Sequence, residues 1–190
     1  ANRLAKKAAM EAYQERKNRL LEIDLEETFI QVFPRRDQLL IIGAGHITLP
    51  LVQFANALDF QTVVIDPRKV FATEERFVSK PDHLLDKWPQ EVLEEWPLHE
   101  DTYAILLTHD PKIDDPALMI LLKHNLPYVG ALGSRKTHAK RCARLDKAGI
   151  SIEKIQSIKG PAGLDIGAKT AGEIALSMLG EVIAAKRGNF

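Results

Sequence analysis

Short apolar runs that end in a turn recur along the chain, with stretches of helical spacing between them. The first run covers residues 39–42 and enters Gly43-Ala44-Gly45, and the second covers residues 62–65 and ends in Asp66. Between them, apolar residues recur at helical spacing: Ile47, Leu51, Phe54, Ala55 and Leu58. A continuous apolar run that ends in glycine is typical of a strand buried on both faces of a parallel sheet. The pattern therefore predicts a strand, a turn, a helix and a second strand.

Further runs extend this alternation to the end of the chain. We predict strands at residues 82–85, 102–107, 128–131 and 152–158, and helices at 91–95, 115–123, from 135 and from 171. Asp115-Pro116 has the acid and the proline that favour a helix start, and Thr170 with Glu173 fits a capping box. The elements predict an α/β fold, a Rossmann-like, open and mostly parallel sheet with helices on both faces.

The first part of the chain has a different composition. Residues 1–22 are rich in Ala, Lys, Glu and Arg, and we expect a helix there with only a thin apolar stripe. Residues 28–33 alternate like a short strand. We therefore predict an N-terminal helical arm and linker at 1–36 and a Rossmann-type domain at 37–190. The arm is expected to pack on the domain or on a second copy of the chain, which would form a homodimer.

The glycine turn carries candidate chemistry. Gly43, Ala44, Gly45 and His46 lie between the first strand and its helix, and Asp66 ends the next strand about 20 residues later. In dinucleotide-binding units the turn lets phosphate approach the backbone, the helix N-terminus favours its charge, and the acid accepts hydrogen bonds from a ribose. Thr48 stands at the third glycine position. The sequence favours a nucleotide-like ligand, and the alternative is a similar sheet whose turn holds none.

Arg68 follows Asp66-Pro67 at the end of the second strand. A guanidinium at this place could meet a phosphate, including the 2′-phosphate of NADP. The alternative is a surface ion pair with Glu74 or Glu75. Residues 69–81 show no helical periodicity, so we expect a loop there.

Polar residues also follow later strands. Thr108, His109 and Asp110 end the run at 102–107, and the glycine-rich loop at 160–168 contains Asp165 between Leu164 and Ile166. The carboxyl ends of parallel strands face the ligand crevice. We expect Asp165 to be buried among its apolar neighbours, and we predict that Asp165 and His109 contact the reactive end of a ligand.

Gly133 and Ser134 precede a helix whose first turn is basic. Cations in the first turn oppose the helix dipole, so the arrangement favours an anionic ligand at the helix N-terminus. The sequence therefore predicts a second anion site at Gly133 and Ser134.

Composition narrows the function classes. The formal net charge is zero, which argues against general nucleic-acid binding and against adsorption to an anionic membrane. No apolar run approaches the roughly 20 residues of a membrane span. The single cysteine, Cys142, excludes an intrachain disulfide and a cysteine-rich metal cluster. We therefore expect a cytoplasmic protein with no metal held by its own side chains.

Several motifs occur together in a fixed order. They are Gly-Ala-Gly-His at 43–46, Asp-Pro-Arg at 66–68, Glu-Arg-Phe at 75–77, Trp-Pro at 88–89, Thr-His-Asp at 108–110, Asp-Asp-Pro-Ala-Leu at 114–118, Tyr-Val-Gly-Ala-Leu-Gly-Ser at 128–134 and Gly-Leu-Asp-Ile-Gly-Ala at 163–168. With these motifs, residues 37–187 resemble the C-terminal, Rossmann-type domain of the xanthine dehydrogenase accessory protein family, the XdhC/CoxI type.

The resemblance implies a chaperone of the molybdenum cofactor rather than an enzyme. Such proteins bind molybdopterin, protect it during sulfuration and deliver it to a molybdenum hydroxylase such as xanthine dehydrogenase, and a sulfurtransferase is a further implied partner. The turn at 43–46 would hold the phosphate, and Thr108, His109, Asp110 and Asp165 would share its crevice. Long members also carry an N-terminal Gly-Gly-Cys-Val-Glu motif, to which Cys142 does not correspond.

Two other functions stay open from the residues. One is an NAD(P)-dependent oxidoreductase, supported by Asp66 and Arg68 and by His46 or His109 as a proton carrier. The other is a non-catalytic domain that binds an adenine nucleotide or a protein. Turnover of a carbonyl substrate would favour the first, and tight AMP binding without activity would favour the second.

Overall fold

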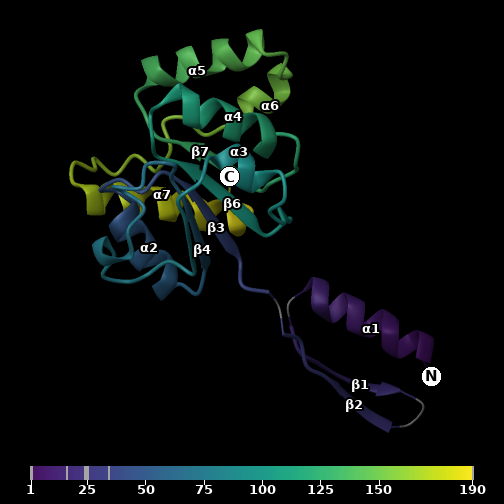
Figure 1. Ribbon diagram of the computed structural model, residues 1–190. Helices are drawn as coiled ribbons and strands as arrows, with labels where there is room; N and C mark the ends of the chain where they lie inside the picture. Colours follow the sequence, from purple (N-terminus) through teal and green to yellow (C-terminus); the bar gives the residue numbers. More distant parts are fainter. Residues whose placement is uncertain (1, 16, 24–25, 34, 190) are drawn as a thin grey trace. The chain divides into compact units, whose positions relative to one another are not determined.

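The first of the two compact units in the chain spans residues 1–36, and the second spans 37–190. The computed structural model describes residues 2–15, 17–23, 26–33 and 35–189. In the first unit, α1 (Asn2–Gln14) is followed by an antiparallel hairpin of β1 (Arg19–Ile23) and β2 (Glu26–Ile30) (Figure 1). Within this unit, Arg19 donates to Glu11 at 3.0 Å and to Glu15 at 2.6 Å.

The prediction of a helix over residues 1–22 is confirmed for α1 and is wrong for residues 19–22. These residues pair in register with β2, with Leu20 opposite Phe29 and Leu21 opposite Thr28. The ladder to β2 supplies backbone hydrogen bonds that the helix would otherwise supply, and helix propensity is too weak to resist such pairing.

The second unit contains a parallel sheet of five strands. In spatial order they are β5 (His83–Leu85), β4 (Gln61–Ile65), β3 (Gln38–Ile42), β6 (Thr102–Leu106) and β7 (Tyr128–Ala131). After β3, the chain adds β4 and then β5 on one side of β3. It then returns to the other side of β3 and adds β6 and then β7. The boundary between β3 and β6 is therefore a topological switch point, where open α/β sheets bind their ligands. The predicted Rossmann-like fold is confirmed.

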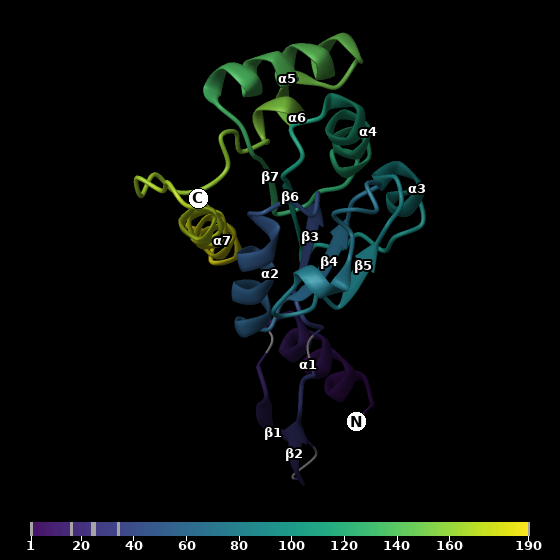
Figure 2. The ribbon, with the colours of Figure 1, turned by 60° about the vertical axis from the view of Figure 1, so that its left-hand side comes forward.

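Helices cover both faces of this sheet (Figure 2). On one face lie α2 (Thr48–Ala57) and α7 (Ala171–Lys186), which pack against each other. The other face carries α3 (Pro89–Leu93), α4 (Pro111–Leu121), α5 (Arg135–Lys147) and α6 (Ile152–Gln156). The loop predicted at residues 69–81 contains one 3-10 turn, η1 (Glu74–Arg76).

The residues of β3 explain why its run is continuously apolar. Leu39 and Ile41 belong to the core cluster under α2 and α7, whereas Leu40 and Ile42 belong to the cluster under the opposite helices. All four side chains are fully buried. Each alternate face of the strand therefore meets a helix layer, as parallel sheets require.

Two element predictions in the second unit are also wrong. Residues 152–156 form α6 rather than a strand, because Ile155 and Ile158 are buried three residues apart while Ile152 is exposed. After α6, Lys159 forms a parallel bridge to Gly130 of β7.

The start of α4 also differs. Residues 110–116 contain an acid followed by proline twice, and the helix begins at the earlier pair, where Asp110 accepts from the Lys112 N–H at 2.9 Å. Asp115-Pro116 therefore lies inside α4, and the prediction that Asp115 caps this helix is wrong.

Candidate functional site

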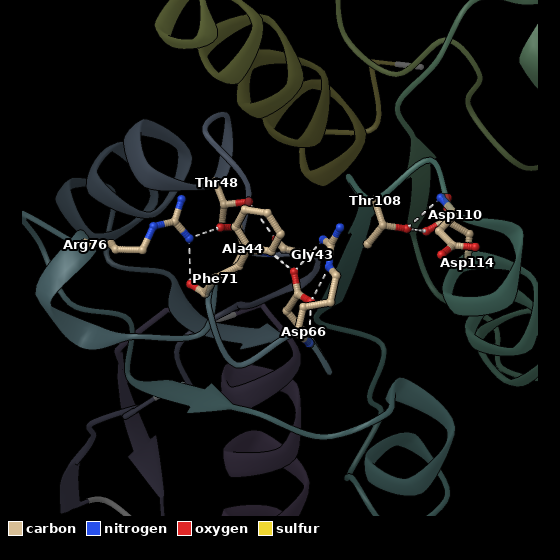
Figure 3. A network of polar contacts seen from close by, with 10 residues as sticks. Gly43, Ala44, Thr48, Asp66, Phe71, Arg76, Thr108, Asp110 and Asp114 are labelled. Carbon is tan, nitrogen blue, oxygen red and sulfur yellow. Dashed lines mark hydrogen bonds and ion pairs between the residues drawn. The ribbon is translucent and has the colours of Figure 1, made fainter.

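The glycine turn after β3 lies directly against the end of β6. Gly43 has a φ of +106°, which favours glycine, and a Cβ at this position would lie 2.7 Å from the Thr108 Cγ2. A side chain there would therefore strain the backbone and collide with Thr108. The close approach joins the two strand ends that flank the switch point, as the sequence predicted (Figure 3).

Thr48 explains the departure from the three-glycine fingerprint. Its fully buried side chain donates from Oγ1 to the Gly43 carbonyl at 2.7 Å, so the hydroxyl closes the turn. Gly45 faces open space, because no atom lies within 4 Å of the position its Cβ would take. The turn is closed on the protein side by Thr48 and is open at Gly45, beside the N-terminus of α2.

Asp66 holds the same turn from below. One carboxylate oxygen accepts from the Ala44 N–H at 2.8 Å and from Arg68 Nη2 at 2.7 Å, and the other accepts from Arg68 Nε at 2.8 Å and from the Arg68 N–H at 3.0 Å. The side chain is fully buried. Burial raises the pKa of this carboxyl, but the hydrogen bonds from Arg68 and from Ala44 outweigh burial and hold the pKa of Asp66 below its usual value. Asp66 is therefore an ionised anchor for the turn.

Two arginines flank the turn around one aromatic ring. The Arg68 guanidinium lies 4.4 Å from the centre of the Phe71 ring and that of Arg76 lies 5.2 Å from it. Arg76 donates to the Ala44 carbonyl at 2.5 Å and to the Phe71 carbonyl at 2.6 Å (Figure 3).

The charges of these arginines are balanced differently. Arg68 pairs with Asp66, and Glu74 pairs with Lys80 at 2.6 Å. The alternative ion pair of Arg68 with Glu74 or Glu75 is therefore not formed. Among the described residues, no carboxylate lies within ion-pair distance of Arg76. A positive charge without a carboxylate partner therefore remains beside the glycine turn.

The end of β6 is organised by Thr108. Its Oγ1 donates to Asp114 through a short hydrogen bond and accepts from the Asp110 N–H at 3.2 Å. Between them, His109 is exposed and has a φ of +63°, which is uncommon outside glycine. His46, at the glycine turn, is also exposed. Both imidazoles are therefore accessible to solvent.

A second group of predicted residues lies beyond β7. A cleft of about 580 Å³ is lined by Leu132, Gly133, Arg135, Ser177 and the glycine-rich loop from Pro161 to Ala168. Ser134 caps α5 by accepting from the Thr137 N–H at 3.1 Å. Asp165 lines the cleft and is exposed, so the prediction that its apolar neighbours bury it is wrong. Leu164 and Ile166 are themselves 43% and 52% exposed, and therefore give Asp165 no apolar cover.

The buried acid that organises this loop is Glu181, on α7. Its Oε2 accepts from the Tyr128 hydroxyl at 2.5 Å and from the Gly163 N–H at 2.7 Å. Burial, and then the hydrogen bond to Glu181, raise the pKa of Tyr128, so the hydroxyl stays protonated and remains a donor. Glu181 thus ties the glycine-rich loop to both β7 and α7.

Arg141 is the largest of the fully buried side chains, with 1% of its surface exposed. Its Nη2 donates to the Leu132 carbonyl at 3.0 Å and lies 3.6 Å from Asp114. Its Nε and Nη1 have no hydrogen-bond partner among the described residues. A buried cation with two unpaired nitrogens therefore lies between the ends of β6 and β7.

A family model described as the XdhC Rossmann domain matches residues 39–182, most of the chain. The chain belongs to this family. The resemblance seen in the motifs is therefore confirmed.

Relatives of the XdhC domain agree with this assignment. A protein of Bacillus subtilis (strain 168) named as a probable xanthine dehydrogenase subunit is 32% identical over 84% of this chain and 46% of its own length. The molybdenum cofactor insertion chaperone PaoD of Escherichia coli (strain K12) is 35% identical over 55% of this chain and 32% of its own. A crystal structure of a xanthine dehydrogenase from Bacillus halodurans matches with a TM-score of 0.70 and 30% identity over 83% of this chain and 44% of that one. The chain spans less than half the length of each of these proteins.

The predicted site residues of this XdhC domain separate into two groups. Those around the switch point are Gly43, Ala44, Gly45, His46, Asp66, Arg68, Thr108, His109 and Asp110. Gly133 and Asp165 line the cleft beyond β7, whose lining includes no residue of the first group, and Ser134 caps the helix beside it. In the part of the chain that the structure describes, no group of three His, Cys, Asp or Glu could hold a metal ion, and no helix is long and apolar enough to cross a membrane.

Sequence reasoning missed Arg141 and Glu181 in the XdhC domain. Arg141 lies four residues before the buried Leu145 on α5, so its spacing placed it on the inner face of that helix. Glu181 lies four residues after the buried Ser177 on α7. A charged residue at a core position of a helix was therefore the available signal.

Proposed function

We propose that this chain is the cofactor-binding domain of an accessory protein that assists maturation of a molybdenum hydroxylase such as xanthine dehydrogenase. Its cargo would be the molybdenum cofactor, a pterin that bears a phosphate. Membership in the XdhC Rossmann-domain family supports the role, as do relatives named as a molybdenum cofactor insertion chaperone and as a probable part of xanthine dehydrogenase.

The open position at Gly45 is the observation that carries the proposal. The turn is at the switch point, beside the N-terminus of α2, and leaves free space where a side chain at residue 45 would be. Such a place accepts a phosphate against the backbone. Arg76, which lacks a carboxylate partner among the described residues, adds positive charge there. The cargo phosphate would occupy this space, and Thr108, His109 and Asp110 would face the rest of the pterin.

The hydrogen bonds of Asp66 favour a pterin phosphate over an adenine dinucleotide. In dinucleotide sites an acid at this position accepts hydrogen bonds from the ribose hydroxyls. Here the carboxylate already accepts four hydrogen bonds from Ala44 and Arg68. A ribose would have to compete with these internal donors, whereas a phosphate at Gly45 requires no change at Asp66.

The test replaces Gly45 by valine. The side chain would fill the space offered to phosphate, and since φ at Gly45 is not positive, the fold should be retained. We expect Gly45→Val to retain less than about one tenth of the cofactor bound by the parent, which corresponds to about 1.4 kcal/mol or more of binding free energy. The bound pterin is oxidised to its fluorescent form and quantified, and the melting temperature is measured on the same samples.

Gly172→Val is the matched control, because Gly172 also faces open space but lies in the first turn of α7 and outside the cleft lining. It should bind the cofactor like the parent. Parent-level cofactor in Gly45→Val would show that the phosphate does not bind at this turn. AMP or NADP binding by a parent protein that takes no pterin would support a nucleotide-binding domain, and turnover of a carbonyl substrate would support an oxidoreductase.

A further inference from the structure

The N-terminus of α5 carries backbone donors without protein acceptors. Among the described residues, the N–H groups of Gly133, Ser134 and Arg135 have no hydrogen-bond partner, because the Ser134 hydroxyl satisfies only the Thr137 N–H. No acid lies in the first turn of this 13-residue helix. The positive end of the helix dipole is therefore not compensated by a carboxylate of its own first turn.

Arg141 lies beneath the same turn. Side chains on a helix lean toward its N-terminus, and the Arg141 guanidinium donates to the carbonyl of Leu132, the residue before Gly133. The side chain is 1% exposed, and its Nε and Nη1 lack partners among the described residues. Burying a cation with unpaired donors is costly, so a purely structural arginine at this position would be poorly compensated.

The titratable neighbours of Arg141 are Asp114 and His138. Burial raises the pKa of Asp114 above its usual value, even though the hydrogen bond from Thr108 and the charge of Arg141 act in the opposite direction. Burial, and then the charge of Arg141, lower the pKa of His138. Both shifts come first from burial, whereas the Nε and Nη1 of Arg141, unpaired among the described residues, are the donors that an anion could satisfy.

We propose that the backbone N–H groups of Gly133, Ser134 and Arg135, with Arg141 buried beneath them, form a second oxyanion subsite that takes a phosphate group. It opens on the cleft of about 580 Å³ that Arg135 and the glycine-rich loop line. Because two strand spacings separate β3 from β7, this subsite lies about 10 Å along the sheet edge from the glycine turn. The subsite deepens the proposed function, on which it rests for the identity of the cargo, by giving a form of that cargo with a second phosphate or another oxyanion group a second anionic contact.

The test uses inorganic phosphate and AMP as probes on the full chain labelled with ¹⁵N. We expect phosphate to shift the amide resonances of residues 133–135, with Arg141→Met weakening phosphate binding at these residues at least tenfold. The melting temperature of Arg141→Met is measured on the same samples, because removing Arg141 leaves the buried Asp114 without its cationic neighbour and should lower the stability of the fold. Unchanged phosphate affinity in Arg141→Met would overturn the proposal, and so would the absence of shifts at residues 133–135 with either probe.

Arg135→Gln keeps the test decisive if Arg141→Met fails to fold. Its matched control is Lys140→Gln, which removes the same charge from an exposed position of α5 outside the cleft. A greater loss of phosphate affinity in Arg135→Gln than in Lys140→Gln supports the subsite. Equal losses in the two variants would show only general electrostatic attraction and would overturn the proposal.

The two probes separate the source of the phosphate. Shifts at residues 133–135 with both AMP and phosphate indicate a phosphate carried by a larger ligand, and shifts with phosphate alone indicate a free oxyanion; both outcomes support the subsite. Gly45→Val should leave these shifts unchanged. A failure of pterin binding at the glycine turn is therefore measured separately from a failure of the α5 subsite.

Discussion

The turns after β3 and after β7 have the same plan but opposite internal chemistry. In each, a glycine of positive φ follows the strand within two residues and precedes a helix, with φ of +106° at Gly43 and +140° at Gly133. At the first turn a buried carboxylate, Asp66, accepts the Ala44 N–H. At the second turn a buried guanidinium, Arg141, donates to a carbonyl, and the neighbouring N–H groups stay unpaired among the described residues.

The difference shows two ways of preparing a backbone turn for an anion. Around Gly43 the protein uses its own anion to fix the turn, so that only the space at Gly45 is left for a ligand. Around Gly133 the protein supplies a buried guanidinium that lies 3.6 Å from Asp114 and whose Nε and Nη1 are unpaired among the described residues, so that a ligand would complete the arrangement. The first turn should therefore contribute more to stability, and the second should depend more on bound anions.

The largest effect should come from removing the anchor of the first turn. Asp66→Ala leaves the buried Ala44 N–H without an acceptor and releases Arg68, which is 40% exposed and can be rehydrated. We expect the free energy of unfolding to fall by about 3 kcal/mol, as measured by urea unfolding at neutral pH. The control is Asp86→Ala, which removes an exposed carboxylate 3.9 Å from Lys69 and should cost less than about 0.5 kcal/mol. Equal effects would show that the turn does not depend on its acid.

The loop that faces the second turn should be affected next. Glu181→Gln replaces a carboxylate that accepts from Tyr128 and Gly163 by an amide, which can accept through only one of its two atoms. We expect a loss of about 2 kcal/mol in unfolding free energy, together with faster hydrogen exchange of the Gly163 amide.

Glu173→Gln is the comparison for Glu181→Gln, since Glu173 is an exposed acid on the same helix that accepts from the Thr170 N–H in the capping box. It should cost less than about 1 kcal/mol and leave the Gly163 amide unchanged. If the Gly163 amide of Glu181→Gln exchanged its hydrogen as slowly as that of the parent, contacts other than Glu181 would hold the loop.

Restoring the three-glycine fingerprint should weaken the first turn rather than improve it. Thr48→Gly removes the hydrogen bond to the Gly43 carbonyl and places glycine in α2, for an expected loss of about 2 kcal/mol. Thr48→Val removes only the hydroxyl and should cost about 1 kcal/mol. Thermal unfolding of both variants separates the two contributions. A more stable Thr48→Gly protein would contradict the assigned role of the hydroxyl.

The two turns also differ in how much of them could be read from the sequence. The unit from β3 to β4 is local, and its apolar runs, its glycines and Asp66 all lie within about 30 residues, so periodicity and spacing were sufficient. The capping box at Thr170 is equally local and is confirmed. The strand prediction for residues 152–158 was wrong because this segment is short and contains three isoleucines spaced three residues apart. In so short a segment, apolar residues do not distinguish a helix from a strand.

The second site could be read only in part, because its main charges act through distant partners. Arg141 donates to Leu132 on the preceding turn, and Glu181 accepts from Tyr128 on β7. Neither pairing follows from local spacing. Asp165 was expected to be buried from its apolar neighbours, yet burial is decided by what the loop packs against, and Leu164 and Ile166 are themselves exposed.

The smallest effect concerns pH, and it has opposite signs at the two buried acids. Burial raises the pKa of Asp66, but the hydrogen bonds from Arg68 outweigh burial and lower it. The contribution of Asp66 to stability is therefore fully present above its pKa in the unfolded chain, about 3.9, and is lost as the pH falls through its pKa in the folded protein. The pKa of Asp114, which contacts Arg141, is raised by burial. Its folded state prefers the proton, so its contribution declines as the pH rises from about 3.9 through the folded pKa.

Asp114→Asn should therefore remove a decline in stability that the parent shows above about pH 4, while Asp66→Asn should remove a decline below it. Urea unfolding of the parent and both variants between about pH 3 and pH 7 gives the three curves. The difference between Asp114→Asn and the parent should change with pH only above the unfolded pKa, in favour of the variant as the pH rises. If that difference were constant across the range, the ionised carboxylate of Asp114 would be fully compensated by Arg141. Such a result would contradict the raised pKa of Asp114.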